Sequence, residues 1–349
     1  MKEMPILGIT MGDVCGIGPE IAVKALGRKE VYETARPLIV GNAGMVERTV
    51  RLLGSDLKVR RISEVKDARF EFGTIDVFHQ ENFNPDDIEY GKVSVIGGKA
   101  AFEAIEKVIS LAMDDKIDAT ITGPLNKEAL NLAGYHYSGH TEIYAELTGT
   151  KNYSMMLAHG DLRVVHVSTH VSLRKACDLV KKDRVRKVIG IAQSACESLG
   201  IKKPRIAVAG LNPHSGENGL FGTEEIEEII PAIEDARTAG LDVTGPVPPD
   251  TVFSKALGGL YDIVVAMYHD QGHIPMKVVG FSMDKATGTW KAVNGVNITL
   301  GLPIIRSSVD HGTAFDQAGK GTASEESLLN AISYGVELAY ARLKAKEEN

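Results

Sequence analysis

The sequence has little cysteine and no long apolar run. Its 349 residues include three cysteines and a single tryptophan. Because this odd, small number of cysteines lacks the spacing of a metal site, it does not indicate a disulfide framework, and we expect reduced thiols in a cytosol. No segment offers the roughly 18 apolar residues that a membrane span needs. Residues 1–5 lack the apolar core of a signal peptide, so we expect a cytoplasmic protein.

An excess of positive charge is also absent. The chain has 39 Lys and Arg residues against 46 Asp and Glu residues, which gives a formal net charge of −7. This balance argues against nucleic acid or an anionic membrane as the main partner. Hydrophobic residues make up 44% of the chain, enough for sizeable cores, and the length suggests about two domains.

Short aliphatic runs alternate with amphipathic stretches along the chain. The runs predict strands over 6–10, 36–40, 119–122, 163–169, 205–209 and 263–267. Helical patterns lie between them, over 99–113, 185–199 and 224–239. Strands that alternate with helices predict an α/β protein with a largely parallel sheet. Ligands bind such sheets beyond the carboxyl ends of the strands.

Four of the ten histidines end or follow a predicted strand, namely His170, His214, His269 and His311. Neutral imidazole is a good ligand for zinc, cobalt or manganese, and three protein ligands with one open position make a Lewis-acid site. The turn-forming residues around each histidine favour a ligand role. For any one of them, a histidine in a surface loop, or one that only donates a hydrogen bond to a metal ligand, is at least an equally good interpretation.

A glycine-rich segment, residues 12–20, follows the first predicted strand and opens a helix. Glycine permits positive φ and lets a ligand approach the backbone closely, so Gly12, Gly16 and Gly18 are candidate ligand contacts. The segment is not the G-x-G-x-x-G dinucleotide fingerprint. A tight turn from strand to helix therefore explains these glycines equally well.

Two other segments have donors suited to an anion. His140 and Thr141 precede a helical pattern, where a helix N-terminus attracts negative charge, although Thr141 could simply cap the helix. Lys277, Asn297 and Arg306 lie in or beside a late apolar run. Arginine offers a bidentate fork for phosphate and lysine a point charge. Taken singly, each of these three is more often a solvated surface residue.

Together, these segments resemble the 4-hydroxythreonine-4-phosphate dehydrogenase family over nearly the whole chain. The matching motifs, each unspecific alone, occur in one order: 16–20, 122–124, 139–142, 212–214, 222–225, 267–272, 295–306 and 310–314. The resemblance implies an NAD-linked oxidation of a secondary alcohol, followed by loss of CO2 from the resulting β-keto acid. It also implies a homodimer in which three histidines, one from the partner subunit, hold a divalent ion such as zinc, cobalt, manganese or magnesium.

The resemblance also assigns roles to individual residues. They are His170, His214 and His269 for the metal, and His140, Thr141, Lys277, Asn297 and Arg306 for the substrate. We further expect Asp250, Asp270 and Lys277 to act in catalysis, and Gly12, Gly16, Gly18, His311, Gly312, Thr313 and Ala314 to contact NAD. The two aspartates are candidates for moving protons or orienting imidazoles, and for Asp250 a helix N-cap is an equal alternative.

The tail segment 311–321 and the stretch 16–20 also resemble the adenosine-binding stretches of isocitrate and isopropylmalate dehydrogenases. This implies their two-domain fold with α/β/α layers. Residues 1–125 and 275–349 would form a discontinuous NAD-side domain, and residues 126–274 a middle domain that dimerises. The active site would lie in the cleft between the domains, at the dimer interface.

Two features depart from the family, and two others indicate a branch within it. The first loop reads Asp13-Val14-Cys15-Gly16, where the family usually has Pro-Ala before the glycine, and Ser282–Asn294 is an insertion. His273-Ile274-Pro275 and the segment 217–222 look more like the branch that acts on 4-phospho-D-threonate and 4-phospho-D-erythronate. The product of that branch would be dihydroxyacetone phosphate.

Three functions stay open at this stage. The first is the sugar-acid phosphate dehydrogenase. The second is the dehydrogenase of the pyridoxine pathway, which acts on 4-phosphooxy-threonine, with an ammonium group at C2 in place of a hydroxyl. The third is a non-catalytic protein that binds a phosphorylated ligand. The three retained histidines count against the third, because a pure binder needs no open metal position.

Overall fold

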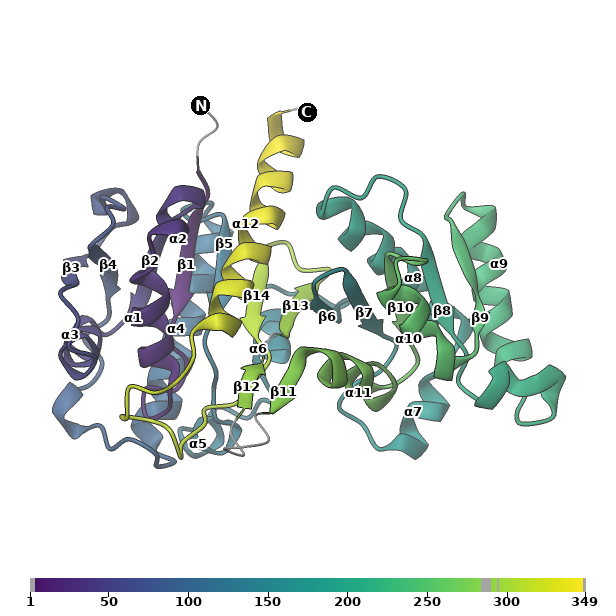
Figure 1. Ribbon diagram of the computed structural model, residues 1–349, viewed down its shortest axis with the longest axis horizontal. Helices are drawn as coiled ribbons and strands as arrows, with labels where there is room; N and C mark the ends of the chain where they lie inside the picture. The colour runs from purple at the N-terminus through teal and green to yellow at the C-terminus, as the bar shows by residue number, and fades with distance from the viewer. Residues whose placement is uncertain (1–3, 284–289, 294, 348–349) are drawn as a thin grey trace. The chain divides into compact units, whose positions relative to one another are not determined.

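The computed structural model describes residues 4–283, 290–293 and 295–347 (Figure 1). The chain forms two compact units, one from Met1–Lys151 with Leu302–Asn349 and the other from Asn152–Gly301. None of the helices in the described part of the chain is long and apolar enough to cross a bilayer.

The first unit contains a parallel sheet with the strand order β3-β4-β2-β1-β5-β14. Its strands are β1 (Ile6–Thr10), β2 (Arg36–Gly41), β3 (Lys58–Ile62), β4 (Thr74–His79), β5 (Ala119–Thr122) and β14 (Arg306–Val309). Its helices are α1 (Gly18–Leu26), α2 (Lys29–Thr34), η1 (Val65–Asp67), α3 (Ala43–Leu52), η2 (Pro85–Asp87), α4 (Val95–Met113), α5 (Lys127–Leu132), α6 (His140–Leu147) and α12 (Glu326–Glu347).

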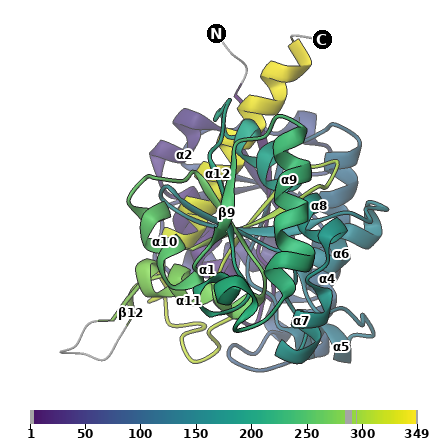
Figure 2. The same ribbon diagram turned by 90° about the vertical axis from the view of Figure 1, so that its right-hand side faces the viewer.

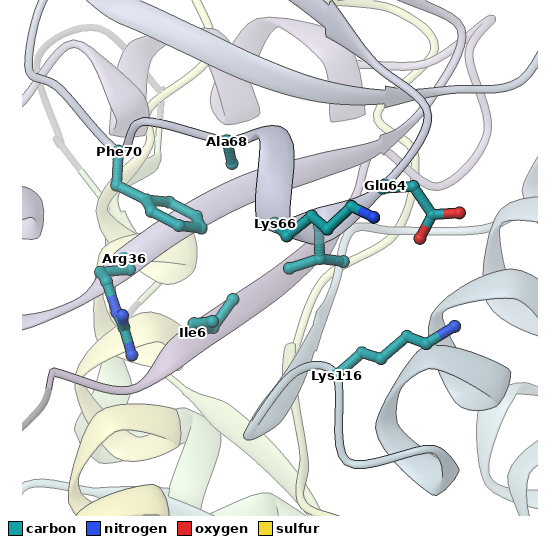
Figure 3. A pocket seen from close by; sticks show the side chains of 8 residues that line it. Ile6, Arg36, Glu64, Lys66, Ala68, Phe70 and Lys116 are labelled. Atoms are coloured by element: carbon teal, nitrogen blue, oxygen red, sulfur yellow. The ribbon is translucent and has the colours of Figure 1, made fainter.

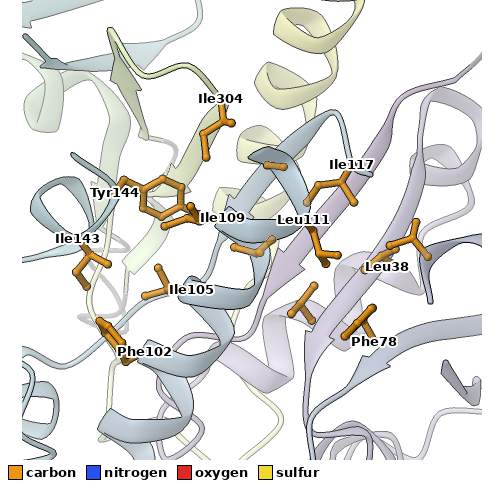
Figure 4. Close-up of a cluster of buried hydrophobic side chains, with 14 of the residues drawn as sticks. Leu38, Phe78, Phe102, Ile105, Ile109, Leu111, Ile117, Ile143, Tyr144 and Ile304 are labelled. Carbon is orange, nitrogen blue, oxygen red and sulfur yellow. The ribbon is translucent and has the colours of Figure 1, made fainter. Parts of the chain in front are cut away.

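Helices pack on both faces of this sheet. Neighbouring residues of a strand point to opposite faces, so one strand can contact helices on both sides. In β5, the side chain of Ile121 lies against Gly335 of α12, whereas Thr120 accepts a hydrogen bond from the hydroxyl of Tyr144 in α6. Buried side chains of β2, α4 and α6 form one core on the α6 side (Figure 4). Tyr144 belongs to this core and links it to the polar groups of β5.

The second unit has the strand order β13-β6-β7-β10-β8-β9 and a separate pair, β11 with β12. Its strands are β6 (Ser154–His159), β7 (Leu162–His166), β8 (Ile206–Ala209), β9 (Val243–Val247), β10 (Ile263–Ala266), β11 (Phe281–Met283), β12 (Trp290–Val293) and β13 (Val296–Leu300). Its helices are α7 (Leu173–Leu179), α8 (Lys182–Ser198), η3 (Pro213–Gly219), η4 (Glu225–Ile229), α9 (Ile230–Thr238), α10 (Pro249–Leu257) and α11 (His269–Gly280).

The predicted α/β class is confirmed, with one local exception to the parallel pattern. In the second unit β7, β10, β8 and β9 are parallel, but β6 runs antiparallel to β7 and to β13. A two-residue turn with Gly160 at φ 53° joins β6 to β7, and so short a turn can only connect antiparallel strands. Figure 2 shows α8 and α9 on one side of β9 and α10 on the other.

The unit bounds lie later in the chain than the sequence-based ones. Helices α5 and α6 contact α4 and so belong to the first unit, whereas α11 contacts β6 and β7 of the second. Strand β11 begins one residue before the expected insertion Ser282–Asn294 and pairs antiparallel with β12 inside it. Residues 284–289 and 294 of that insertion lie outside the described residues.

Candidate active site

A buried arginine forms the centre of a polar cluster in the first unit. Arg306, the first residue of β14, is only 2% exposed. Its guanidinium donates to the hydroxyl of Thr122 at 3.2 Å and to that of Thr141 at 3.5 Å, and it lies 5.4 Å from the ring centre of Tyr144. Burial lowers the pKa of Arg306 to about 10, so the side chain is still a cation at neutral pH. The interpretation of Arg306 as a solvated surface residue is therefore wrong.

His140 and Thr141 begin the helix beside this cation. Gly139 is the N-cap of α6, so Thr141 lies inside the first turn, and the alternative that it caps the helix is wrong. Burial and the charge of Arg306 lower the pKa of His140 well below its usual value, which keeps the imidazole neutral. Its Nε2 atom is buried and has no hydrogen-bond partner among the described residues. The cluster thus combines one fixed cation with neutral donors, a suitable arrangement for a phosphate.

The glycines of the first loop are explained by the packing of the chain on itself. A Cβ atom on Gly12 would lie 2.0 Å from the carbonyl oxygen of Pro124, and one on Gly18 would lie 1.7 Å from that of Met11. On Gly16 it would meet the carbonyl oxygen of Thr313 at 2.7 Å. The whole loop is buried, so these glycines are required whether or not a cofactor binds.

The tail segment is attached to this loop. The amide of Ile17 donates to the carbonyl of Thr313 at 3.0 Å, and Lys24 donates to the carbonyls of Gly321 and Ala323. The two stretches that resemble a nucleotide site are thus neighbours in the first unit. Thr313 is buried, Gly312 is exposed, and His311 and Ala314 are half-buried; all four stay candidates for NAD contact.

The residues of the first loop that depart from the family pattern form buried contacts within the loop and with Ser94. Asp13 accepts a hydrogen bond from the amide of Cys15 at 2.9 Å, and the Cys15 thiol lies 3.2 Å from the hydroxyl of Ser94. Burial raises the pKa of Asp13 from 3.8 to about 6. The loop therefore contains a carboxyl group whose ionisation opposes folding.

This carboxyl should make stability depend on pH. Between pH 3.8 and about 6 the folded protein holds a proton that the unfolded chain releases, so stability falls as the pH rises through this window. Asp13→Asn should remove that loss, with a gain over the parent that grows to about 2–3 kcal/mol above pH 6. Denaturant unfolding at several pH values measures it, with the exposed Asp316→Asn as control. Parallel pH profiles for parent and Asp13→Asn would contradict the assignment.

In the second unit, two of the expected metal ligands lie together. His170 follows β7 and His269 begins α11 after β10, and their ring centres are 5.9 Å apart. Nδ1 of His269 lies 2.7 Å from a carboxylate oxygen of Asp270, which leaves Nε2 as the available ligand atom. Both histidines line a cavity of about 500 Å³ with Thr169, Val171, Ser172, Leu173, Ala176, Tyr268 and Asp270.

The third expected ligand is not part of this group. His214 lies in η3, where residues 214–218 all have positive φ and so form a left-handed turn. Such a turn costs L-residues about 1–2 kcal/mol each, and the buried carboxylate of Glu225 stabilises its start by accepting from the amides of Leu211 and Asn212. In the described part of the chain, no three His, Cys, Asp or Glu side chains come together as a metal site.

The remaining expected residues are distributed over the second unit. Lys277 lies on α11, with its ammonium 4.4 Å from the ring centre of Phe281. Asn297 lies on β13 and donates to the sulfur of Met155 at 2.7 Å. Asp250 is exposed in the first turn of α10, whose N-cap is Pro248, so its alternative role as an N-cap is wrong.

A separate cavity of about 530 Å³ lies at the other end of the first unit's strands. It is lined at the amino ends of β1 and β2 by Ile6 and Arg36, with Glu64, Val65, Lys66, Ala68, Phe70 and Lys116 (Figure 3). Ligands of parallel sheets bind beyond the carboxyl ends of strands, so this cavity does not belong to the candidate active site.

The chain is similar to known proteins along nearly its whole length. The family described as pyridoxal phosphate biosynthetic protein PdxA matches residues 33–335. The D-threonate 4-phosphate dehydrogenase of Cupriavidus necator is 50% identical, over 97% of this chain and 98% of that protein. The D-threonate 4-phosphate dehydrogenase of Salmonella typhimurium is 48% identical, over 97% of this chain and 100% of that protein. A crystal structure of 4-hydroxythreonine-4-phosphate dehydrogenase from Klebsiella pneumoniae matches with a TM-score of 0.86 at 44% identity, over 96% and 98%.

Proposed function

The chain belongs to the PdxA family, and two of its relatives are named dehydrogenases. We therefore propose that it oxidises 4-phospho-D-threonate or 4-phospho-D-erythronate with NAD. The observation that carries the proposal is the 48–50% identity, over 97% of the chain, to two proteins named D-threonate 4-phosphate dehydrogenase. The buried Arg306 cluster supports it, because such a cation with hydroxyl and imidazole neighbours suits the phosphate of the substrate.

The proposed reaction has two steps. The hydroxyl at C3 loses its proton to a base, and its carbon gives a hydride to NAD, which leaves a 3-keto acid. The bond between C1 and C2 then breaks, CO2 leaves, and C2 takes up a proton to give dihydroxyacetone phosphate. Lys277 and Asp250 are the proposed proton carriers. Asp270 orients the ring of His269 through the 2.7 Å contact.

A divalent ion is part of the proposal. The imidazoles of His170 and His269 fit such an ion, since they share one cavity and His269 presents Nε2. His214 would complete the set from the partner subunit of a homodimer. When bound, the ion would supply Lewis-acid stabilisation of the negative charge that develops on the substrate oxygens.

The main alternative is 4-phosphooxy-threonine as the substrate, which the name of the Klebsiella pneumoniae structure favours. The two candidates differ at C2, where one has a hydroxyl and the other an ammonium group. We expect kcat/KM for 4-phospho-D-threonate or 4-phospho-D-erythronate to exceed that for 4-phosphooxy-threonine by about tenfold or more. Steady-state NADH formation with all three compounds measures this. A preference for the ammonium compound would select the alternative.

A further inference from the structure

Four histidines form a row in the second unit, and two of them have no role in the proposed reaction. From the buried end, the ring centres of His166 and His273 are 4.8 Å apart, and those of His273 and His269 are 3.6 Å apart. His269 is followed by His170 at 5.9 Å. The rings of His269 and His273 are nearly parallel, with an interplanar angle of 10°.

His273 is itself held in place on several sides. It is 7% exposed, and its Nδ1 lies 2.9 Å from the carbonyl oxygen of His269, one helical turn earlier on α11. Behind it, Gly272 lets the helix approach β7, because a Cβ at this position would lie 2.3 Å from Nε2 of His166. The buried ring of His273 therefore presents a fixed flat face to the half-exposed ring of His269.

We propose that His273 is a positioning residue that fixes the ring plane of His269, and so the direction in which Nε2 of His269 meets a divalent ion. The inference rests on the proposed function, since His269 is a ligand only there. Asp270 alone is a weaker restraint, because its side chain is 69% exposed. Stacking against His273 supplies a second restraint from within the protein.

Two substitutions at His273 distinguish the effect of its stacked ring from the effect of its hydrogen bond. His273→Phe keeps an aromatic face and removes the Nδ1 contact, whereas His273→Asn keeps a nitrogen donor for the His269 carbonyl and removes the face. Cobalt(II) titration of the intact protein gives a dissociation constant and a visible absorption spectrum that reports ligand geometry. His136→Phe, at an exposed histidine of the first unit, is the matched control.

We expect His273→Asn to weaken cobalt binding by about 10–100-fold and to change the spectrum. His273→Phe and His136→Phe should stay within about threefold of the parent, because both keep the flat face on His269. Should His273→Asn not fold, His273→Leu takes its place, since it fills the volume without a flat ring. The inference would be wrong if parent and His273→Asn had equal affinities and spectra, or if His273→Phe lost as much affinity as His273→Asn. Either result would leave the proposed metal site untouched. Failure of the parent to bind cobalt would overturn the proposed metal site as well.

Discussion

Mixing two inactive variants, His214→Ala and His269→Ala, should restore about a quarter of the parent's activity. Each variant alone should lose nearly all turnover, because each removes a proposed metal ligand from both sites of the proposed dimer. His170 and His269 are neighbours within one chain, whereas His214 lies apart from them. In a mixed dimer, one site then contains both substitutions and the other site contains neither. Random exchange gives about half mixed dimers, each with one intact site of two.

A second mixture provides the matched control. His170→Ala with His269→Ala should show no recovery, since both ligands come from the same chain and each site of a mixed dimer keeps one defect. NADH formation after subunit exchange measures both mixtures, and co-purification of differently tagged subunits verifies the exchange. Recovery in the control mixture but not in the first would show that His170 and His269 serve different sites.

Arg306→Ala should raise KM for the phosphorylated substrate by about tenfold or more. Loss of a charged hydrogen-bond donor costs about 1.5–3 kcal/mol, which corresponds to a factor of about 10–150 in affinity. Arg306→Lys should lie between parent and alanine variant, because it keeps the charge but loses the fork that reaches Thr122 and Thr141. Steady-state kinetics measures both.

Because Arg306 is buried, its substitution also affects the fold, and a control is needed. Arg163→Lys changes another mostly buried arginine, at the amino end of β7, where it contacts Asp161 and Asp262. It should leave KM unchanged. A KM for Arg306→Ala equal to that of the parent, in a protein that unfolds cooperatively, would exclude Arg306 from phosphate binding.

Local patterns predicted six of the fourteen strands in the described part of the chain, and local chemistry explains where one predicted helix differed. β1 and β5 have the predicted bounds, since alternating aliphatic runs end at glycine turns. The helix predicted over 224–239 is instead a π-helix, Glu225–Ile229, followed by α9. Pro231 lies at the start of α9 and has no amide hydrogen to donate, which explains the break.

The candidate site was harder to predict, because its contacts join distant parts of the chain. Thr122 and Tyr144 had no assigned role, although the motif 122–124 was part of the resemblance, and only the fold brings them to Arg306. The position of His273 in the sequence does indicate its contact with His269. It lies four residues after His269, the spacing at which side chains stack on one face of a helix.

The most direct test of the account is whether the purified protein reduces NAD with 4-phospho-D-threonate or 4-phospho-D-erythronate. We expect one NADH and one dihydroxyacetone phosphate for each substrate consumed. We also expect chelation to abolish both products, and zinc, cobalt or manganese to restore them. Binding of these acids without NADH formation, in protein supplied with metal and NAD, would contradict the account and favour a non-catalytic phosphate-ligand-binding protein.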